Sequence, residues 1–241
     1  METVAEIENL KKAFGNNHVL NGVSLKIEQG ENLVVFGKSG SGKTVLIKCL
    51  IGLMEADDGN IILFGKDISG LNEEQLNELR KKVGFLFQSA ALYDSMSVRE
   101  NLEFPLRGSK QKSKMEVDAL VKEALKNVGL EEAIDKMPSE LSGGMRKRVG
   151  LARSLILNPE IILYDEPTTG LDPITSKEIS HLILDVQKKY NAAAIIITHD
   201  KECARITANQ MIILKDGKFI AEGTFKELSE SKDEWVSSFF H

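Results

Sequence analysis

Hydrophobic and polar positions alternate along some parts of the chain, whereas other parts contain continuous hydrophobic runs. The two patterns predict two kinds of strand. Residues Val4 to Leu10 and Val19 to Ile27 alternate apolar and polar side chains on either side of the turn Gly15-Asn16-Asn17. This period of two is typical of an antiparallel pair with one solvated face. Continuous apolar runs instead predict strands covered on both faces. Such runs follow at Asn32–Phe36, Ile161–Asp165 and Ala192–Thr198.

Shorter apolar runs beside turn residues predict the remaining strands. A strand over Ile61–Phe64 is expected to follow a turn at Asp57–Asn60, and another to cover Val83–Phe87. The Asp216-Gly217 turn between two further runs predicts a hairpin. Its strands are Met211–Leu214 and Phe219–Glu222.

Apolar residues at helical spacing predict helices between these strands. They cover Val45–Leu50, Glu73–Lys82, Met115–Val128, Ser142–Leu157 and Pro173–Tyr190. Alternating strands and helices indicate an α/β fold, with a mostly parallel sheet and helices on both faces. The N-terminal pair adds an antiparallel β subdomain. Residues 89–140 lack strand-like runs and are predicted to form a helical subdomain, inserted into a core of residues 1–88 and 141–241 within one domain.

Composition narrows the functions that this fold could serve. The 241 residues suffice for a full core, and the formal net charge is −5. The basic run Arg146-Lys147-Arg148 is too short for a nucleic-acid footprint, so nucleic-acid binding is disfavoured. The N-terminus does not resemble a secretory signal, and the apolar runs fall far short of the roughly 18 residues of a membrane span. A membrane role would therefore require a partner. Cys49 and Cys203 are isolated, so we expect reduced, structural thiols.

A glycine-rich turn between a buried strand and a helix carries the clearest chemistry. It comprises Gly37, Lys38, Ser39, Gly40, Ser41, Gly42, Lys43 and Thr44. In this context the pattern G-x-x-x-x-G-K-[ST] indicates a phosphate-binding loop, whose backbone N–H groups and helix N-terminus face an anion. Lys43 would contact the β- and γ-phosphates of a nucleotide, and Thr44 would offer its hydroxyl to Mg²⁺. The alternative is a tight turn that merely needs glycine.

Two further segments add candidate groups. Asp165 and Glu166 stand at the carboxyl end of a buried strand, where ligands of open α/β sheets bind. Asp165 is expected to hold Mg²⁺ through water, and Glu166 to act on the attacking water; a merely solvated acidic pair is the alternative. Ser142 is predicted to cap a helix, and Gly143 and Gly144 leave backbone N–H groups open to an anion. A capped helix start alone would explain the same residues.

The segment Leu141-Ser142-Gly143-Gly144-Met145 adds to the motifs above. Together they make the chain resemble the ATP-binding cassette (ABC) transporter ATPases over nearly its entire length. The resemblance implies ATP and Mg²⁺ as cofactors, and a head-to-tail homodimer in which Ser142, Gly143 and Gly144 of one subunit cover the γ-phosphate held by the other. By the same resemblance, Phe14 would stack on adenine, and Gln88 would reach Mg²⁺ and the attacking water. Asp172 would lie in the loop that crosses the dimer, and His199 would contact the γ-phosphate. Phe14 could instead be a core residue and His199 a structural one. The remaining histidines, His18, His181 and His241, match no motif and are expected at the surface.

The resemblance extends to one subtype. Residues 87–102, the segment Phe104-Pro105-Leu106-Arg107 and the Met145-containing signature resemble the ATPase of the Mla and Mce lipid-transport systems. This implies a separate permease that docks near Ser89–Met96, an Mce-domain lipid-binding protein as a further partner, and a place at the cytoplasmic face of the inner membrane. Two other hypotheses stay open: the ATPase of another importer or exporter, for amino acids or drugs, and a non-transport nucleotide switch. The amphipathic segment 235–240 is expected to pack on the core.

Overall fold

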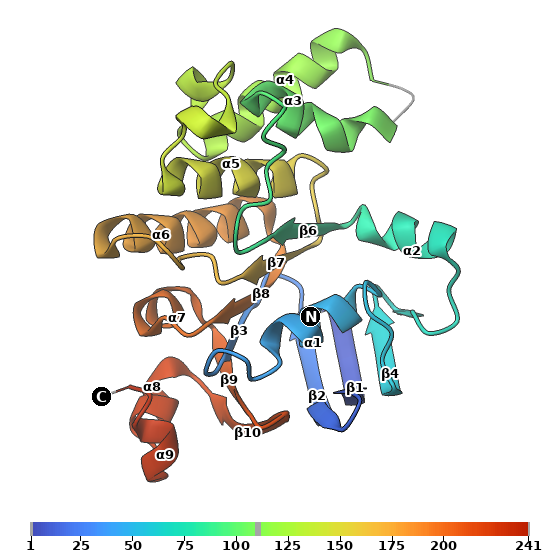
Figure 1. Cartoon of the computed structure of the whole chain (residues 1–241), viewed down its shortest axis with the longest axis vertical. Coiled ribbons are helices and arrows are strands. Elements are labelled where there is room, and N and C mark those ends of the chain that lie inside the picture. Colours follow the sequence, from blue (N-terminus) through green and yellow to red (C-terminus); the bar gives the residue numbers. More distant parts are fainter. Residues whose placement is uncertain (1, 109–111, 241) are drawn as a thin grey trace.

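The fold is built on two β-sheets in the computed structural model, which describes residues 2–108 and 112–240 (Figure 1). The first sheet is antiparallel and has the strand order β2-β1-β4-β5. Its strands are β1 (Thr3–Phe14), β2 (Asn17–Glu28), β4 (Asp58–Leu63) and β5 (Lys66–Asp67). The predicted N-terminal antiparallel subdomain is therefore confirmed, and it gains the short strand β5.

The second sheet has the order β10-β9-β3-β8-β7-β6 and is parallel except for its β9–β10 hairpin. Its strands are β3 (Asn32–Phe36), β6 (Val83–Leu86), β7 (Ile161–Asp165), β8 (Ala193–Thr198), β9 (Gln210–Lys215) and β10 (Lys218–Gly223). Phe36 pairs with Thr198, and Asp165 pairs with Ile197. The carboxyl ends of β3, β8 and β7 thus lie side by side, which places the residues that follow them at one edge of the sheet.

Apolar residues on the two faces of β3 explain why this strand is buried on both sides. Val34 and Phe36 belong to a core shared with α5 (Gly143–Leu155) and α6 (Pro173–Tyr190). Leu33 and Val35 belong to a second core between the sheets, which includes Leu46 and Ile47 of α1 (Lys43–Leu50). The continuous apolar pattern is what a strand between two cores requires, and the predicted α/β class is confirmed.

The other helices lie around the sheets, and those of residues 89–140 pack beyond α5 (Figure 1). The described residues of this stretch contain helices and no strand. They form α3 (Val98–Glu103), η1 (Phe104–Gly108), α4 (Lys114–Asn127), η2 (Glu131–Ala133) and η3 (Pro138–Glu140). The remaining helices are α2 (Glu73–Arg80), α7 (Lys201–Thr207), α8 (Phe225–Ser229) and α9 (Glu234–Ser237). None of the helices in the described part of the chain is both long and apolar enough to span a membrane.

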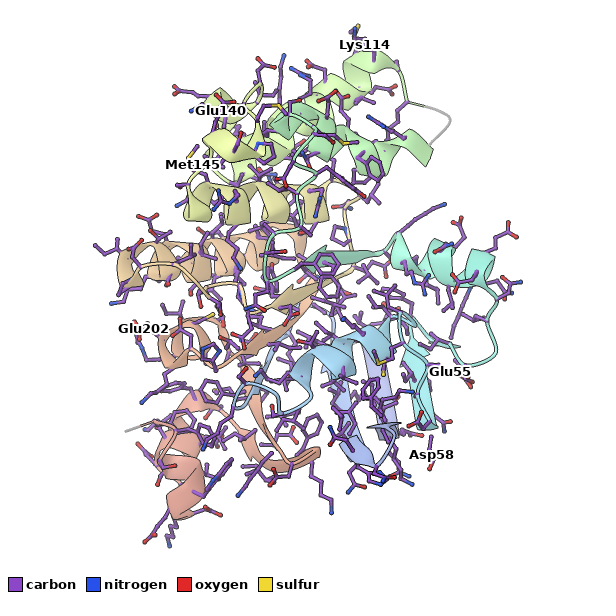
Figure 2. The ribbon with its side chains drawn as sticks, viewed as in Figure 1. Glu55, Asp58, Lys114, Glu140, Met145 and Glu202 are labelled. Carbon is purple, nitrogen blue, oxygen red and sulfur yellow. The ribbon has the colours of Figure 1, made fainter. Side chains whose placement is uncertain are left out.

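One predicted turn is wrong. Strand β4 begins at Asp58, inside the segment expected to turn at Asp57–Asn60, because Asp58 pairs with Lys11 and Asn60 with Glu8 of β1. Gly59 has φ 97° and adjoins an irregularity in that pairing, so it supplies a bulge rather than a chain reversal. Asp58 also receives a hydrogen bond of 2.7 Å from Lys11 Nζ. Figure 2 shows Asp58 at the edge of this sheet.

Several smaller expectations are confirmed. Both cysteines are free and buried, and burial raises the pKa of each thiol to about 11. His18 and His181 are exposed, whereas His241 lies outside the described residues. The C-terminal segment packs on the core, since the rings of Phe239 and Phe240 lie 5.6 and 6.1 Å from that of Phe36.

Candidate functional site

The glycine-rich loop connects β3 to α1 and has the backbone shape of an anion cradle. Gly40 and Gly42 have φ angles of 79° and 102°, in the left-handed region that glycine favours. A Cβ atom at Gly42 would lie 2.8 Å from the backbone oxygen of Val19, so a larger residue would not fit. Gly42 precedes α1 without a side-chain cap, which leaves the first N–H groups of the helix to a ligand.

Lys43 and Ser41 supply polar groups inside this loop. The Lys43 side chain is 5% exposed, and its ammonium donates hydrogen bonds to the carbonyl oxygens of Gly37 (2.8 Å) and Lys38 (3.1 Å). It also forms an ion pair of 3.4 Å with Glu166 Oε1. The Ser41 hydroxyl is buried and has no hydrogen-bond partner among the described residues. A buried hydroxyl without a partner costs free energy, and a phosphate oxygen would satisfy it.

Thr44 and Asp165 meet across the end of β7. The Thr44 hydroxyl donates to Asp165, with distances of 3.1 and 3.3 Å to the two carboxylate oxygens. Burial raises the pKa of Asp165, the Thr44 hydrogen bond opposes that rise, and the neighbouring Glu166 charge adds to it. A hydroxyl and a carboxylate are hard oxygen donors, and Mg²⁺ takes only one or two carboxylates when phosphates and water complete its shell. The residues present therefore fit Mg²⁺ bound together with a polyphosphate.

Glu166 occupies a strained position directly after β7. Its φ is 50°, an uncommon value for a residue with a side chain, and its N–H donates to the Ile197 carbonyl at 2.9 Å. Its carboxylate is held from both sides, because Oε1 faces Lys43 and Oε2 lies 2.8 Å from His199 Nδ1. The Thr169 hydroxyl donates to the same Oε2 at 3.2 Å. These three contacts fix the orientation of the Glu166 carboxylate.

These residues line one pocket of about 340 Å³. Its lining consists of Val19, Ser39, Gly40, Gly42, Lys43, Thr44, Val45, Gln88, Glu166 and His199. The structure thus brings together the glycine-rich loop, Gln88, Glu166 and His199, and Asp165 through Thr44. Among the described residues, this lining does not include Phe14, which ends β1 with 49% of its surface exposed.

Ser142, Gly143, Gly144 and Asp172 form a second group of predicted site residues, which lies outside this lining. Ser142 caps α5 and accepts a hydrogen bond of 3.2 Å from the Met145 N–H. Asp172 caps α6, accepting from the amides of Ile174 and Thr175 at 3.0 Å each, and the Thr175 hydroxyl and amide hold its pKa below the usual range. A Cβ at Gly144 would lie 2.6 Å from Thr175 Cγ2, so the two helix starts are in contact. Figure 2 marks this end of α5 at Met145.

Two residues of the site are absent from the sequence-based prediction as functional groups. Thr169 donates to Glu166 Oε2, a contact that depends on the turn after β7. Lys147 is buried in α5 and donates to the carbonyl oxygens of Gln88 (2.6 Å) and Glu166 (3.0 Å). Its position offered a signal, because Lys147 stands four residues before the core residue Leu151 on one helix face.

Comparisons with known proteins point to one family. A family model described as ABC transporter matches residues 20–169. The chain is 40% identical to the probable ribonucleotide transport ATP-binding protein mkl of Mycobacterium leprae, over 100% of this chain and 70% of that protein. It is 39% identical to the chloroplastic protein TRIGALACTOSYLDIACYLGLYCEROL 3 of Arabidopsis thaliana, over 99% of this chain and 73% of that protein.

Relatives of similar identity carry other transport names. The methionine import ATP-binding protein MetN of Rhizobium johnstonii is 38% identical over 92% of this chain and 61% of its own length. The intermembrane phospholipid transport system ATP-binding protein MlaF of Haemophilus influenzae is 37% identical over 99% of this chain and 90% of its own length. A solved dimeric ATP-binding cassette, in a post-hydrolysis state with ADP and Pi, matches with a TM-score of 0.84 and 31% identity, over 92% of this chain and 99% of that chain.

Proposed function

The chain belongs to the ABC transporter family as an ATP-binding ATPase subunit, and from this premise we propose that it drives a lipid transporter of the Mla/Mce type. ATP hydrolysis in this family is coupled to transport, and its cassettes dimerise and act with membrane permease subunits.

The proposed hydrolysis uses groups already held in the pocket. Lys43 and the loop amides bind the phosphates, and the ammonium exchanges its bonds to Gly37 and Lys38 for phosphate oxygens. Glu166 accepts the proton of the water whose oxygen attacks the γ-phosphorus, while the bond to the ADP oxygen breaks. His199 Nδ1 lies 2.8 Å from Glu166 Oε2, and His199 would also contact the γ-phosphate. The fixed carboxylate of Glu166 is the observation that carries this assignment.

The residues around Thr44 are proposed to bind Mg²⁺. Thr44 and Gln88 would contact it directly and Asp165 through water, and the bound cation would neutralise phosphate charge. Phe14 is proposed to stack on adenine from the exposed end of β1. Its exposed ring supports a ligand contact better than a core role.

A second copy of the chain would complete each site. Ser142, Gly143 and Gly144 form an open helix start whose free N–H groups have no anion partner within the described chain, and Asp172 lies beside them. We propose that these residues cover the γ-phosphate held by the partner subunit in a head-to-tail dimer. The dimeric structure of a similar cassette supports this arrangement.

The permease is proposed to dock on the helical subdomain of residues 89–140, at the cytoplasmic face of the membrane. Tyr93 and Phe104 are 44% and 38% exposed there, with ring centroids 4.8 Å apart. Arg107 lies over the Phe104 ring at 5.3 Å. The exposed aromatic pair joins Tyr93 of the Ser89–Met96 segment to Phe104 of η1, and it suits contact with a partner helix.

The cargo is proposed to be a phospholipid or another lipid, with an Mce-domain protein as a further partner. The names of two relatives refer to a lipid or to phospholipid transport, and this chain covers 90% of the length of one of them, MlaF. The second candidate is another transporter, since the relatives named for ribonucleotide and methionine transport are equally similar.

Copurification distinguishes these candidates. Tagged Glu166→Gln protein, which should retain ATP, is recovered from its native membranes with ATP and Mg²⁺, and proteins and lipids are identified by mass spectrometry. Lys43→Ala protein treated identically is the control, because it should not form the ATP-bound dimer. A permease enriched with an Mce-domain protein and lipid supports the proposal. A different permease would reject the lipid assignment, and a failure to recover any membrane partner would favour a nucleotide switch outside transport.

A further inference from the structure

A buried lysine connects helix α5 to two residues of the hydrolysis site. The Lys147 side chain reaches inward from α5, and the residue is 5% exposed. Its ammonium donates to the Gln88 carbonyl at 2.6 Å and to the Glu166 carbonyl at 3.0 Å. The side chains of the same two residues line the pocket that holds Lys43 and Thr44. Lys147 therefore holds the backbone of residues whose side chains face the nucleotide.

The two carbonyls come from neighbouring strands. Strand β6 pairs with β7 in parallel, with Leu86 opposite Tyr164, and Gln88 and Glu166 each follow two residues later. Both residues lie just beyond their strands. The Glu166 N–H still donates to the Ile197 carbonyl of β8, but the Glu166 carbonyl belongs to the next peptide, where it accepts from the Thr169 N–H at 3.3 Å as well as from Lys147. Glu166 also has the strained φ of 50°, a conformation that persists only where its surroundings enforce it. The ammonium supplies one contact to each peptide at the point where sheet pairing stops.

Core packing alone does not account for a lysine at this position. Leu151 and Leu155 follow it by four and eight residues on the packed side of α5, and both are buried apolar residues. Burial disfavours the charged amine and lowers the pKa of Lys147 to about 8, although the charges of Asp165 and Glu166 oppose the shift. An apolar side chain would avoid this desolvation cost. The charged group instead satisfies two carbonyls at the site.

We propose that Lys147 is a positioning residue for ATP hydrolysis. It holds the backbone of Gln88 and of Glu166 at fixed positions relative to each other and to helix α5, which Ser142 caps. The inference rests on the proposed roles of Gln88 and Glu166. It also gives a physical link between the helix start offered to the partner subunit and the groups that act on water, because Ser142 caps α5 and Lys147 follows it by five residues in the same helix.

The test measures kcat, KM for ATP, the Kd for Mg-ATP and the melting temperature in the full chain. In Lys147→Met, which keeps the side-chain length but removes the donors, kcat should fall by about 10- to 100-fold, as expected for a small displacement of reacting groups. KM and Kd should change by less than about threefold, because the phosphate contacts remain. Lys147→Arg retains a cation with several donors and should recover at least about fivefold of the lost kcat.

A half-exposed lysine that also joins two elements serves as a control outside the site. Lys189 of α6 donates to Asn127 Oδ1 of α4 and lies outside the described pocket lining, so Lys189→Met should keep wild-type kcat. Unchanged kcat in Lys147→Met would overturn the inference. So would a parallel loss of kcat, ATP affinity and melting temperature, since that pattern indicates only a structural role. If Lys147→Met does not fold, Lys147→Gln, which keeps one donor group, is judged by the same criteria.

Turnover is also measured in Glu166→Gln, because this variant shows whether a negative result concerns Lys147 alone or the proposed role of Glu166. Wild-type turnover in Glu166→Gln would reject the role of Glu166 on which Lys147 depends. Slow turnover there, combined with normal turnover in Lys147→Met, would reject the role of Lys147 alone.

Discussion

The phosphate-loop pocket and the start of α5 differ in how many of their polar groups find partners within the same chain. In the pocket, Lys43, Thr44 and Glu166 all have hydrogen-bond or ionic partners from other segments of the same chain. At the start of α5, Ser142 is exposed and contributes only its own helix cap, and Ile174 beside Asp172 is 73% exposed. The start of α5 thus leaves its first N–H groups open at the surface, which agrees with the proposed dimer.

The two regions therefore support different functions within a single subunit. Binding of the phosphates needs only the loop and Lys43, so it should survive in a monomer. Hydrolysis should require the second copy, because Ser142, Gly143 and Gly144 do not line the pocket of their own chain. Variants of the two regions should therefore fail in different ways.

The broadest effect is expected from Lys43→Ala, which removes the buried ammonium of the pocket and should impair ATP binding and therefore also turnover. Loss of one partner of a buried charged contact costs about 2 kcal/mol or more, so ATP affinity should fall by at least about 30-fold. Calorimetric titration with Mg-ATP measures this, and Lys66→Ala on β5 is an exposed lysine control. Wild-type affinity in Lys43→Ala would refute the phosphate-loop assignment.

Glu166→Gln should separate binding from chemistry within the same pocket. The amide keeps the shape of the side chain but cannot take a proton, and a general base contributes about 10²- to 10⁴-fold to rate. We expect kcat to fall in that range while ATP binding and ATP-dependent dimerisation persist. Single-turnover hydrolysis and light scattering measure the two properties. Loss of ATP binding together with turnover would contradict the assigned role.

Mixing two inactive variants tests the second region directly. Gly143→Asp places a carboxylate where the partner's phosphate is expected, although a Cβ there meets only Leu171 Cδ2, at 3.4 Å, and the fold should tolerate it. Each homodimer should be inactive, whether formed by Gly143→Asp or by Lys43→Ala. The mixed dimer contains one site with an intact loop from one chain and an intact helix start from the other.

ATPase activity of the mixture should therefore exceed the sum of the two separate variants. Two copies of Gly143→Asp, mixed as differently tagged preparations, are the control. If the mixture stays as inactive as its components while the mixed dimer is shown to form, the head-to-tail arrangement is rejected.

The sequence predicted those parts of the fold and site that depend on local pattern. The buried strands at 32–36 and 161–165 were predictable because both of their faces need apolar residues. The loop at 37–44 was predictable because its glycines have a backbone requirement of their own. The turn at Asp57–Asn60 was wrong because pairing with β1 overrides the local preference of Asp and Asn. The short helices α7, α8 and α9 span too few residues to show a clear period.

Contacts between distant segments could not be predicted from spacing. Glu166 and His199 are 33 residues apart and meet only because β7 and β8 are adjacent and parallel. Lys147 reaches Gln88 from 59 residues away, through the packing of α5 on the end of β6. The catalytic and binding roles of the site residues remain predictions. Phe14 is the predicted nucleotide contact with the weakest structural support, because it does not line the phosphate pocket.

The smallest effect is expected at Phe14, which lies apart from the lining of the phosphate pocket. Its ring is close to half exposed, and Lys12 Nζ lies 5.7 Å from its centroid. Stacking on a base contributes about 1 to 3 kcal/mol, and the lower end applies to a ring that keeps contact with water, so Phe14→Ala should weaken ATP binding by about fivefold. Phe14→Tyr retains the aromatic face and should bind ATP as the wild type does. Titration with ATP and with inorganic triphosphate distinguishes the base contact, because only ATP affinity should respond; an equal loss for both ligands would place the effect of Phe14 on the loop rather than on adenine.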